Sequence, residues 1–246
     1  MRNSSWFAFN SLTLAGALAL SLGSAPVFAD GHEASAADAS LQKLMDGNAR
    51  FVAGEMMHPN LSAERRAELA KGQSPYAIIV SCSDSRVPPE QVFDAGPGDL
   101  FVIRVAGNVV GDDAQASIEY AVAVLGSPLV VVMGHESCGA VDAAVKSEMK
   151  DAEFGGHIHD LVETIRPSVI SAMERASEDE LLEAAIQDNA ERVVTELERS
   201  KPYVGPAAKE GKIKIVAARY DLDTGKVSIF GEDHHAAKAH DHDHAN

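Results

Sequence analysis

Two short segments of the sequence gather side chains that can bind a metal ion and handle protons. Cys82, Asp84 and Arg86 follow one another closely, and His135 and Cys138 are separated by two residues. Two thiolates and an imidazole, completed by water or a carboxylate, form a tetrahedral donor set that suits zinc, and an open fourth position is typical of catalytic zinc. The two segments therefore predict a catalytic zinc site, provided that the fold brings them together.

The same residue types also occur in proteins for simpler reasons. Two cysteines in an exported protein commonly form a disulfide, a single histidine such as His135 is often a core residue, and Asp84 with Arg86 could be a local surface pair. Against the disulfide, both cysteines are expected at strand ends beside partners that can bind metal. Each simple explanation is reasonable alone, but together they require four coincidences of residue type and position.

Three uninterrupted apolar runs supply the strands that would position these residues. The runs 76–80, 100–103 and 129–133 lack polar alternation, which is typical of strands buried on both faces of a parallel sheet. Helical segments separate the runs, and strand–helix–strand alternation favours right-handed crossovers. Because open parallel sheets bind ligands beyond the carboxyl ends of their strands, the segments after the first and third runs are expected to meet there.

Helices and an antiparallel edge complete the predicted domain. An N-terminal helical arm runs from Asp38, its expected N-cap, to Phe51, and a second helix opens at Ser62. Further helices are expected after Pro88-Pro89, over 112–125, over 138–150 and as a pair within 158–199 that breaks near Ala176. Residues 212–218 form a fourth strand, and a turn over 220–227 leads to a short edge strand. The fold class is therefore α/β, with a mostly parallel sheet flanked by helices.

The two ends of the chain differ from this domain. Arg2, an apolar stretch over 12–22 and small residues up to Ala29 predict a secretory signal peptide over residues 1–29. The stretch is too short to cross a bilayer, which takes about 20 residues. We therefore expect export, to the bacterial periplasm, of a single domain over 30–232 with a core at about 40–230. The tail over 233–246 holds five of the ten histidines and is expected to be flexible.

The charge balance excludes two classes of partner. The chain carries 21 basic and 37 acidic residues, a net charge of −16, which repels phosphate backbones and anionic lipid. Aromatic residues make up 5% of the chain, and a surface that stacks single-stranded bases needs them. We expect no nucleic-acid partner, and no membrane association once the signal peptide is removed.

Four motifs together resemble those of the β-class carbonic anhydrases. They are Cys82-Ser-Asp-Ser-Arg-Val87, Phe101-Val-Ile-Arg-Val-Ala-Gly-Asn-Val109, Ser117-Ile-Glu-Tyr-Ala121 and Gly134-His-Glu-Ser-Cys-Gly-Ala140. The resemblance covers roughly residues 40–230, in the order and spacing of the family, and the combination is far more specific than any single motif. The signal peptide and the tail lie outside it.

The resemblance implies zinc-dependent, reversible hydration of CO₂ to bicarbonate and a proton, with zinc-bound hydroxide as the nucleophile and one Zn²⁺ per chain. Cys82, His135 and Cys138 would be the metal ligands. Asp84 would either accept a hydrogen bond from the zinc-bound water or, in a closed form, bind zinc itself. Arg86 would pair with Asp84 and hold it off the metal.

The resemblance also implies how substrate is held. Phe101 and Tyr120 match an apolar wall supplied partly across a subunit interface, Gln73 matches a side-chain donor to bicarbonate, and the Gly139 amide would be a second donor. A homodimer or larger homo-oligomer is therefore implied. Two other functions stay open at this point: hydrolysis of CS₂ or COS on the same scaffold, and a catalytically silent periplasmic zinc-binding protein that uses the tail histidines.

Overall fold

The computed structural model describes residues 35–231 of the chain. The predicted signal peptide over 1–29 and the predicted tail over 233–246 lie outside these residues. A search of the described helices finds none that is both long and apolar enough to cross a membrane.

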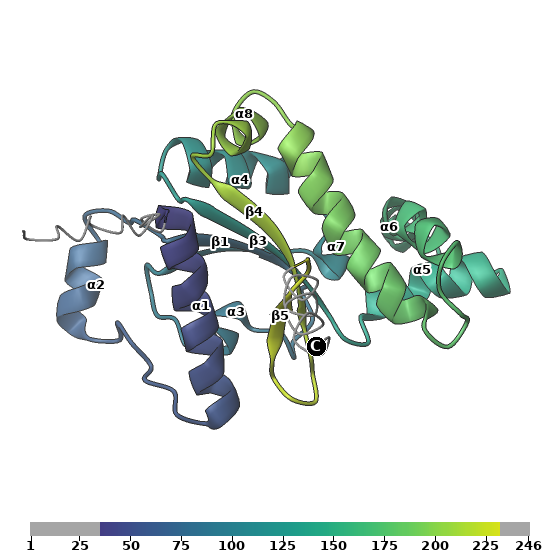
Figure 1. The fold of residues 1–246 in the computed structure, drawn as a ribbon, viewed down its shortest axis with the longest axis horizontal. Helices are drawn as coiled ribbons and strands as arrows, with labels where there is room; N and C mark the ends of the chain where they lie inside the picture. The colour runs from purple at the N-terminus through teal and green to yellow at the C-terminus, as the bar shows by residue number, and fades with distance from the viewer. Residues whose placement is uncertain (1–34, 232–246) are drawn as a thin grey trace, which may run out of the picture. The chain divides into compact units, whose positions relative to one another are not determined.

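A five-stranded sheet with the order β2-β1-β3-β4-β5 lies at the centre of the described residues (Figure 1). Its strands are β1 (Ala77–Ser81), β2 (Leu100–Arg104), β3 (Leu129–His135), β4 (Lys214–Tyr220) and β5 (Val227–Ile229). The first four are parallel and β5 runs antiparallel to β4, as the sequence predicts. β1 and β3 are buried along their whole lengths, which explains why their apolar runs show no alternation.

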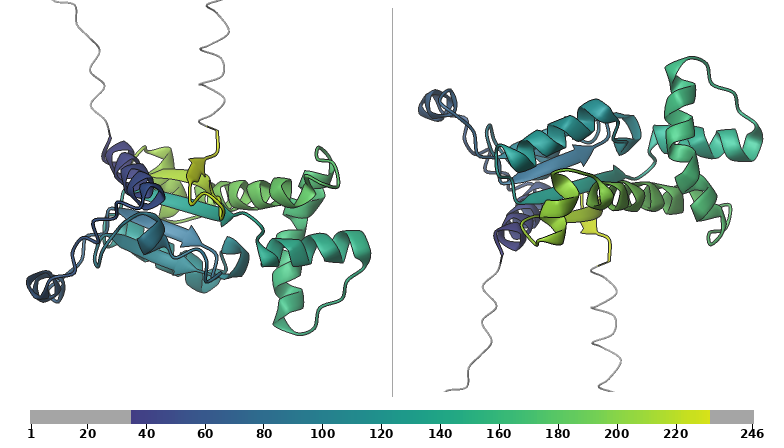
Figure 2. Two further views of the ribbon diagram at one scale, coloured as in Figure 1. Left: turned by 90° about the horizontal axis from the view of Figure 1, so that it is seen from below. Right: turned by 90° about the horizontal axis from the view of Figure 1, so that it is seen from above.

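Helices cover both faces of this sheet (Figure 2). They are α1 (Ala36–Ala53), α2 (Ala63–Leu69), α3 (Pro89–Val92), α4 (Asp112–Ala123), α5 (Gly139–Lys150), α6 (His157–Met173), α7 (Leu181–Arg199) and α8 (Val204–Lys209), with a 3₁₀ turn, η1, at Ala106–Asn108. Leu41 and Leu44 of α1 pack against one face of the sheet. α4, α7 and α8 contribute to the core on the other face.

A third apolar cluster lies beyond the carboxyl ends of the strands. The helices α5, α6 and the first half of α7 form it, and they extend past the sheet on that side (Figures 1 and 2). Cys82 and Cys138 belong to this cluster. These helices therefore cover the edge of the sheet where the sequence places the polar motifs, and they keep water away from the two thiols.

Several boundaries differ from the sequence prediction, and two short elements were not expected. α1 begins at Ala36 because Ser35, rather than Asp38, is its N-cap: the Ser35 hydroxyl oxygen accepts a hydrogen bond from the Asp38 N–H at 3.1 Å. Asp38 lies in the first turn, where its charge favours the helix N-terminus. β4 begins at Lys214, two residues later than expected. The short α8 and η1 were not predicted, because neither is long enough to show a periodic pattern.

Candidate metal centre

The carboxyl ends of β1 and β3 bring the two polar motifs together. Cys82 directly follows β1, His135 is the last residue of β3, and Cys138 is the N-cap of α5. One ligand atom from each of these residues lies within 4.8 Å of the other two. All three are buried, with exposed fractions of 4%, 0% and 1%. The structure therefore brings these three residues into one cluster.

The donor set of this cluster fits zinc. Nδ1 of His135 lies 2.8 Å from the Glu136 carbonyl oxygen, so Nδ1 carries the proton and the lone pair is on Nε2. Nε2 is buried without a hydrogen-bond partner among the described residues, and such a buried acceptor is costly unless a ligand satisfies it. Cys82 and Cys138 are free thiols, so they do not form the disulfide considered above.

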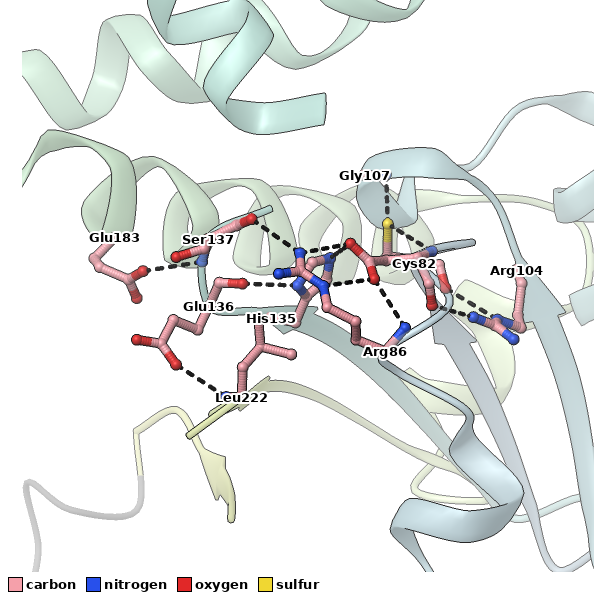
Figure 3. A network of polar contacts seen from close by, with 10 residues as sticks. Cys82, Arg86, Arg104, Gly107, His135, Glu136, Ser137, Glu183 and Leu222 are labelled. Atoms are coloured by element: carbon pink, nitrogen blue, oxygen red, sulfur yellow. Dashed lines mark hydrogen bonds and ion pairs between the residues drawn. The ribbon is translucent and has the colours of Figure 1, made fainter. Parts of the chain in front are cut away.

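The two thiols have different electrostatic surroundings. A hydrogen bond from Cys138 holds the pKa of Cys82 well below its usual range, and the backbone N–H groups of Gly107 and Asp84 donate to its Sγ at 3.3 and 3.4 Å (Figure 3). The same contact, together with burial, raises the pKa of Cys138, because two neighbouring thiolates repel each other. A bound dication would remove that repulsion and take the place of the remaining proton.

Asp84 and Arg86 form a bidentate ion pair beside the cluster. Arg86 donates from Nε to Oδ1 at 2.9 Å, from Nη2 to Oδ2 at 2.7 Å and from its backbone N–H to Oδ1 at 2.9 Å. Arg86 thereby lowers the pKa of Asp84 to about 2. Oδ2 lies 3.9 Å from Nε2 of His135. The carboxylate therefore faces the cluster while both of its oxygens are engaged by Arg86.

The loop between β3 and α5 is held from two sides (Figure 3). Ser137 has a positive φ of 50°, its carbonyl accepts from Arg86 Nη2 at 3.4 Å, and its N–H donates to Glu183 of α7 at 3.4 Å. Glu183 in turn pairs with Arg219 of β4 at 2.7 Å. No local motif points to Glu183 or Arg219, because their partners are far away in the sequence.

Arg104, the last residue of β2, fixes the backbone of the first motif. Its guanidinium donates to the carbonyl oxygens of Cys82 and Asp84 (Figure 3). The Cys82 carbonyl has left the β1 ladder, and Arg104 satisfies it. The Asp84 carbonyl also accepts from the Val87 N–H at 3.1 Å, and Arg104 is its second donor. Arg104 stands inside a motif quoted above, but its position there does not reveal which groups it contacts.

Comparison with known proteins agrees with this geometry. A family model described as carbonic anhydrase matches residues 77–227. The solved structure of a tetrameric β-carbonic anhydrase from Sordaria macrospora superimposes with a TM-score of 0.62 at 27% identity, and covers 78% of this chain and 98% of that one. The chain belongs to the β-class carbonic anhydrases. A β-carbonic anhydrase of Aspergillus fumigatus has the same TM-score of 0.62 at 28% identity, and covers 82% of this chain and 94% of that one.

Two curated relatives of this β-class carbonic anhydrase are more similar in sequence. Carbonic anhydrase 2 of Mycobacterium tuberculosis is 41% identical over 195 residues, which are 78% of this chain and 91% of the relative. The carbonic anhydrase of Mycolicibacterium smegmatis is 39% identical over 195 residues, 78% of this chain and 92% of the relative. The match extends over nearly the whole length of both relatives.

The four residues assigned to substrate by family resemblance lie in two places. Gly139 is the first residue of α5, directly beside the cluster. Gln73 precedes β1, Phe101 pairs with Ile78 near the start of that strand, and the Tyr120 ring lies 6.4 Å from the Phe101 ring. Cys82 is four residues beyond Ile78, about 13 Å along a strand. Within one chain of this carbonic anhydrase, Gln73, Phe101 and Tyr120 are therefore at the far end of the sheet from the cluster.

Proposed function

We propose that this β-class carbonic anhydrase catalyses the reversible, zinc-dependent hydration of CO₂ to bicarbonate and a proton. The observation that carries the proposal is the buried group of Cys82, His135 and Cys138 with its unpartnered Nε2. These residues would hold one Zn²⁺ per chain, since the described residues contain one such group. When bound, the ion supplies the Lewis acidity that activates water near neutral pH.

Asp84 orients the nucleophilic water in this proposal. A pKa of about 2 keeps its carboxylate ionised near neutral pH, so it accepts a hydrogen bond from that water and does not serve as a proton store. Arg86 occupies both carboxylate oxygens and thereby holds Asp84 away from the metal position. The product then leaves, and its proton passes to buffer.

Gly139 and a second copy of the chain hold the substrate. Gly139 begins α5, and the first N–H groups of a helix have no partner within the helix, so its amide can donate to a bicarbonate oxygen. Gln73, Phe101 and Tyr120 serve the site of a neighbouring subunit, because they are remote from the cluster of their own chain. β2 pairs only with β1 among the described residues, and 48% of Tyr120 is exposed beside it. These observations support a homodimer or a larger homo-oligomer.

Metal analysis and two activity assays on the purified protein test the reaction. We expect about one zinc per chain, rapid CO₂ hydration in a stopped-flow assay with a pH indicator, and no comparable release of sulfide from CS₂ or COS. Cys138→Ser is expected to lose tight zinc and activity together, because one of the three ligands is gone. A zinc-loaded wild-type enzyme that does not hydrate CO₂ would contradict the proposal, and sulfide release in its place would favour the alternative substrates.

Export to the bacterial periplasm, with cleavage after Ala29, is proposed from the sequence alone. The pattern of Arg2, the apolar stretch over 12–22 and the small residues before Ala29 supports it. N-terminal sequencing of protein recovered from the periplasmic fraction is expected to begin at Asp30. Recovery of the full chain from the cytoplasm alone would contradict it.

A further inference from the structure

The thiol of Cys82 receives a hydrogen bond from a backbone turn that has little freedom. The N–H of Gly107 in η1 donates to Cys82 Sγ at 3.3 Å (Figure 3). Gly107 has φ 67° and ψ 22°, a left-handed conformation that favours glycine. A Cβ at this position would lie 2.7 Å from Ile165 Cδ1 and 3.2 Å from Ala140 Cβ. The turn is therefore packed closely against α5 and α6 on the side where a Cβ would point. Its carbonyl oxygen needs a hydrogen-bond donor from another element.

Asn189 of α7 supplies the hydrogen-bond donor to this carbonyl oxygen. Its Nδ2 donates to the Gly107 carbonyl oxygen at 2.8 Å, while its Oδ1 accepts from Ser168 Oγ and Arg192 Nη2, both at 3.4 Å. An arginine can only donate, so these contacts fix the amide with its NH₂ group toward Gly107. The side chain satisfies both ends of its amide in this way.

The position of Asn189 would suit an apolar residue if packing were its only role. It is fully buried on α7, and Ile186 and Val193, three residues before and four after it on the same helix face, are buried and apolar. An amide at such a place costs free energy unless it is fully hydrogen-bonded. The hydrogen bond to Gly107 thus gives a reason for a polar residue at this position in an apolar core.

We propose that Asn189 is a positioning residue for the metal centre, which it serves by holding the Gly107 turn so that the Gly107 N–H donates to Cys82 Sγ. The inference rests on the proposed zinc function. A donor to a metal-bound thiolate fixes the sulfur and withdraws charge from it, and loss of such a supporting group changes metal affinity or activity about 10–100-fold. Asn189 acts through Gly107, and its own hydrogen-bond partners are Gly107, Ser168 and Arg192.

If Asn189 had only a structural role, it would link α7 to η1, and its loss would lower stability without changing metal binding. The test therefore needs a matched control. Asn189→Asp keeps the side-chain shape and the acceptor for Ser168 and Arg192, but replaces the donor to Gly107 by an oxygen. Asn48→Asp is the control. Asn48 of α1 is also buried, donates to the Gly225 carbonyl oxygen at 2.8 Å, and belongs to the helix on the other face of the sheet. Both variants lose a buried amide–carbonyl hydrogen bond of 2.8 Å. Asn48→Asp also loses a second one, to the Val92 carbonyl oxygen at 3.1 Å, so the control is expected to lose at least as much stability as Asn189→Asp.

The measurement uses the purified full chain loaded with Co²⁺, and separately with Zn²⁺. Two properties are recorded: the rate at which a chelator removes the metal, and the thiolate-to-cobalt charge-transfer absorption. Because Asn189 lies one residue further from the metal than a direct donor, we expect Asn189→Asp to release metal about tenfold faster, at the lower end of the range for supporting groups. Its absorption band is expected to shift. Asn48→Asp is expected to match the wild type in both properties while losing stability.

Two results would overturn the inference. In the first, Asn189→Asp is destabilised but keeps the release rate and absorption of the wild type. In the second, both variants release metal equally faster, as general loosening predicts. Asn189→Leu, which removes the donor without burying a charge, gives the same comparison when the aspartate variant does not fold. A wild-type chain that binds neither cobalt nor zinc overturns the proposed function itself, which distinguishes the two failures.

Discussion

Replacing Arg86 by alanine removes the side-chain donors from Asp84 and leaves all three metal ligands in place. The pair is bidentate, with N···O distances of 2.9 and 2.7 Å. About half of the Arg86 side chain is exposed, 51%, so water screens the pair and its contribution to folding stability is small. Without Arg86 the pKa of Asp84 rises from about 2 toward 3.8, so the carboxylate stays ionised at neutral pH.

An unpaired Asp84 is expected to compete for the metal. Its Oδ2 lies 3.9 Å from Nε2 of His135, whereas two ligands of one tetrahedral zinc ion, with bonds of about 2.1 Å, lie roughly 3.4 Å apart. A small rotation of the freed carboxylate therefore brings it to a ligand distance from the imidazole. A carboxylate in the fourth position excludes water, so we expect Arg86→Ala to keep zinc and to lose about 10–100-fold in kcat/KM, as other supporting groups do.

The assay measures zinc content, CO₂ hydration and urea unfolding on the same preparations. Arg166→Ala is the matched control, because Arg166 donates to Glu148 at 2.8 Å and 46% of its side chain is exposed, in α6. We expect the two variants to lose similar stability and only Arg86→Ala to lose activity. Wild-type turnover in Arg86→Ala with zinc retained would refute the reasoning, since Asp84 would then need no partner to stay off the metal.

Three further outcomes are expected. Phe101→Glu places a charge beside the unpaired edge of β2 and is expected to give an inactive monomer in sedimentation; an active monomer would contradict the role of a second subunit. The pKa values of Asp84 and Asp221 lie at about 2, below their ordinary 3.8, so their stabilisation is present above pH 4 and is lost as the pH falls from about 4 to 2. Urea unfolding of metal-free protein is expected to give a lower free energy of unfolding at pH 3 than at pH 5, and this difference is expected to be smaller in Asp221→Asn. The same difference in the variant and the wild type would contradict the role of Asp221. Deletion of residues 234–246 is expected to leave turnover unchanged, and a large fall at low buffer that imidazole restores would instead indicate proton transfer by the tail.

The strands and the clustering of Cys82, His135 and Cys138 could be predicted because their signals are local. The runs 76–80 and 129–133 are apolar throughout since β1 and β3 are buried on both faces. The residues of this cluster follow the ends of these runs, where a parallel sheet presents its ligand-binding edge. A prediction of this kind needs only the order of residues along the chain.

The supporting contacts could not be predicted, because they join distant parts of the chain. Asn189 and Gly107 are 82 residues apart, and nothing around Asn189 distinguishes it from any polar residue on a Leu- and Glu-rich helix. Glu183 and Arg219 meet only because α7 packs beside β4. The start of α1 is ambiguous for a local reason, since Ser35 and Asp38 are both good capping residues and only the backbone shows that Ser35 is used.

The order of the strands explains why the cluster forms where it does. The chain passes from β1 outward to β2 and then returns to place β3 on the other side of β1, in the order β2-β1-β3-β4. The connections after β1 and after β3 therefore leave the sheet in opposite directions, which is the strand order at which parallel sheets bind ligands, beyond the carboxyl ends of the two strands. Cys82 follows β1 at this point, and His135 and Cys138 lie at and after the end of β3. A metal ion bound there links both halves of the sheet, so its binding is expected to stabilise the fold as well as to supply the chemistry.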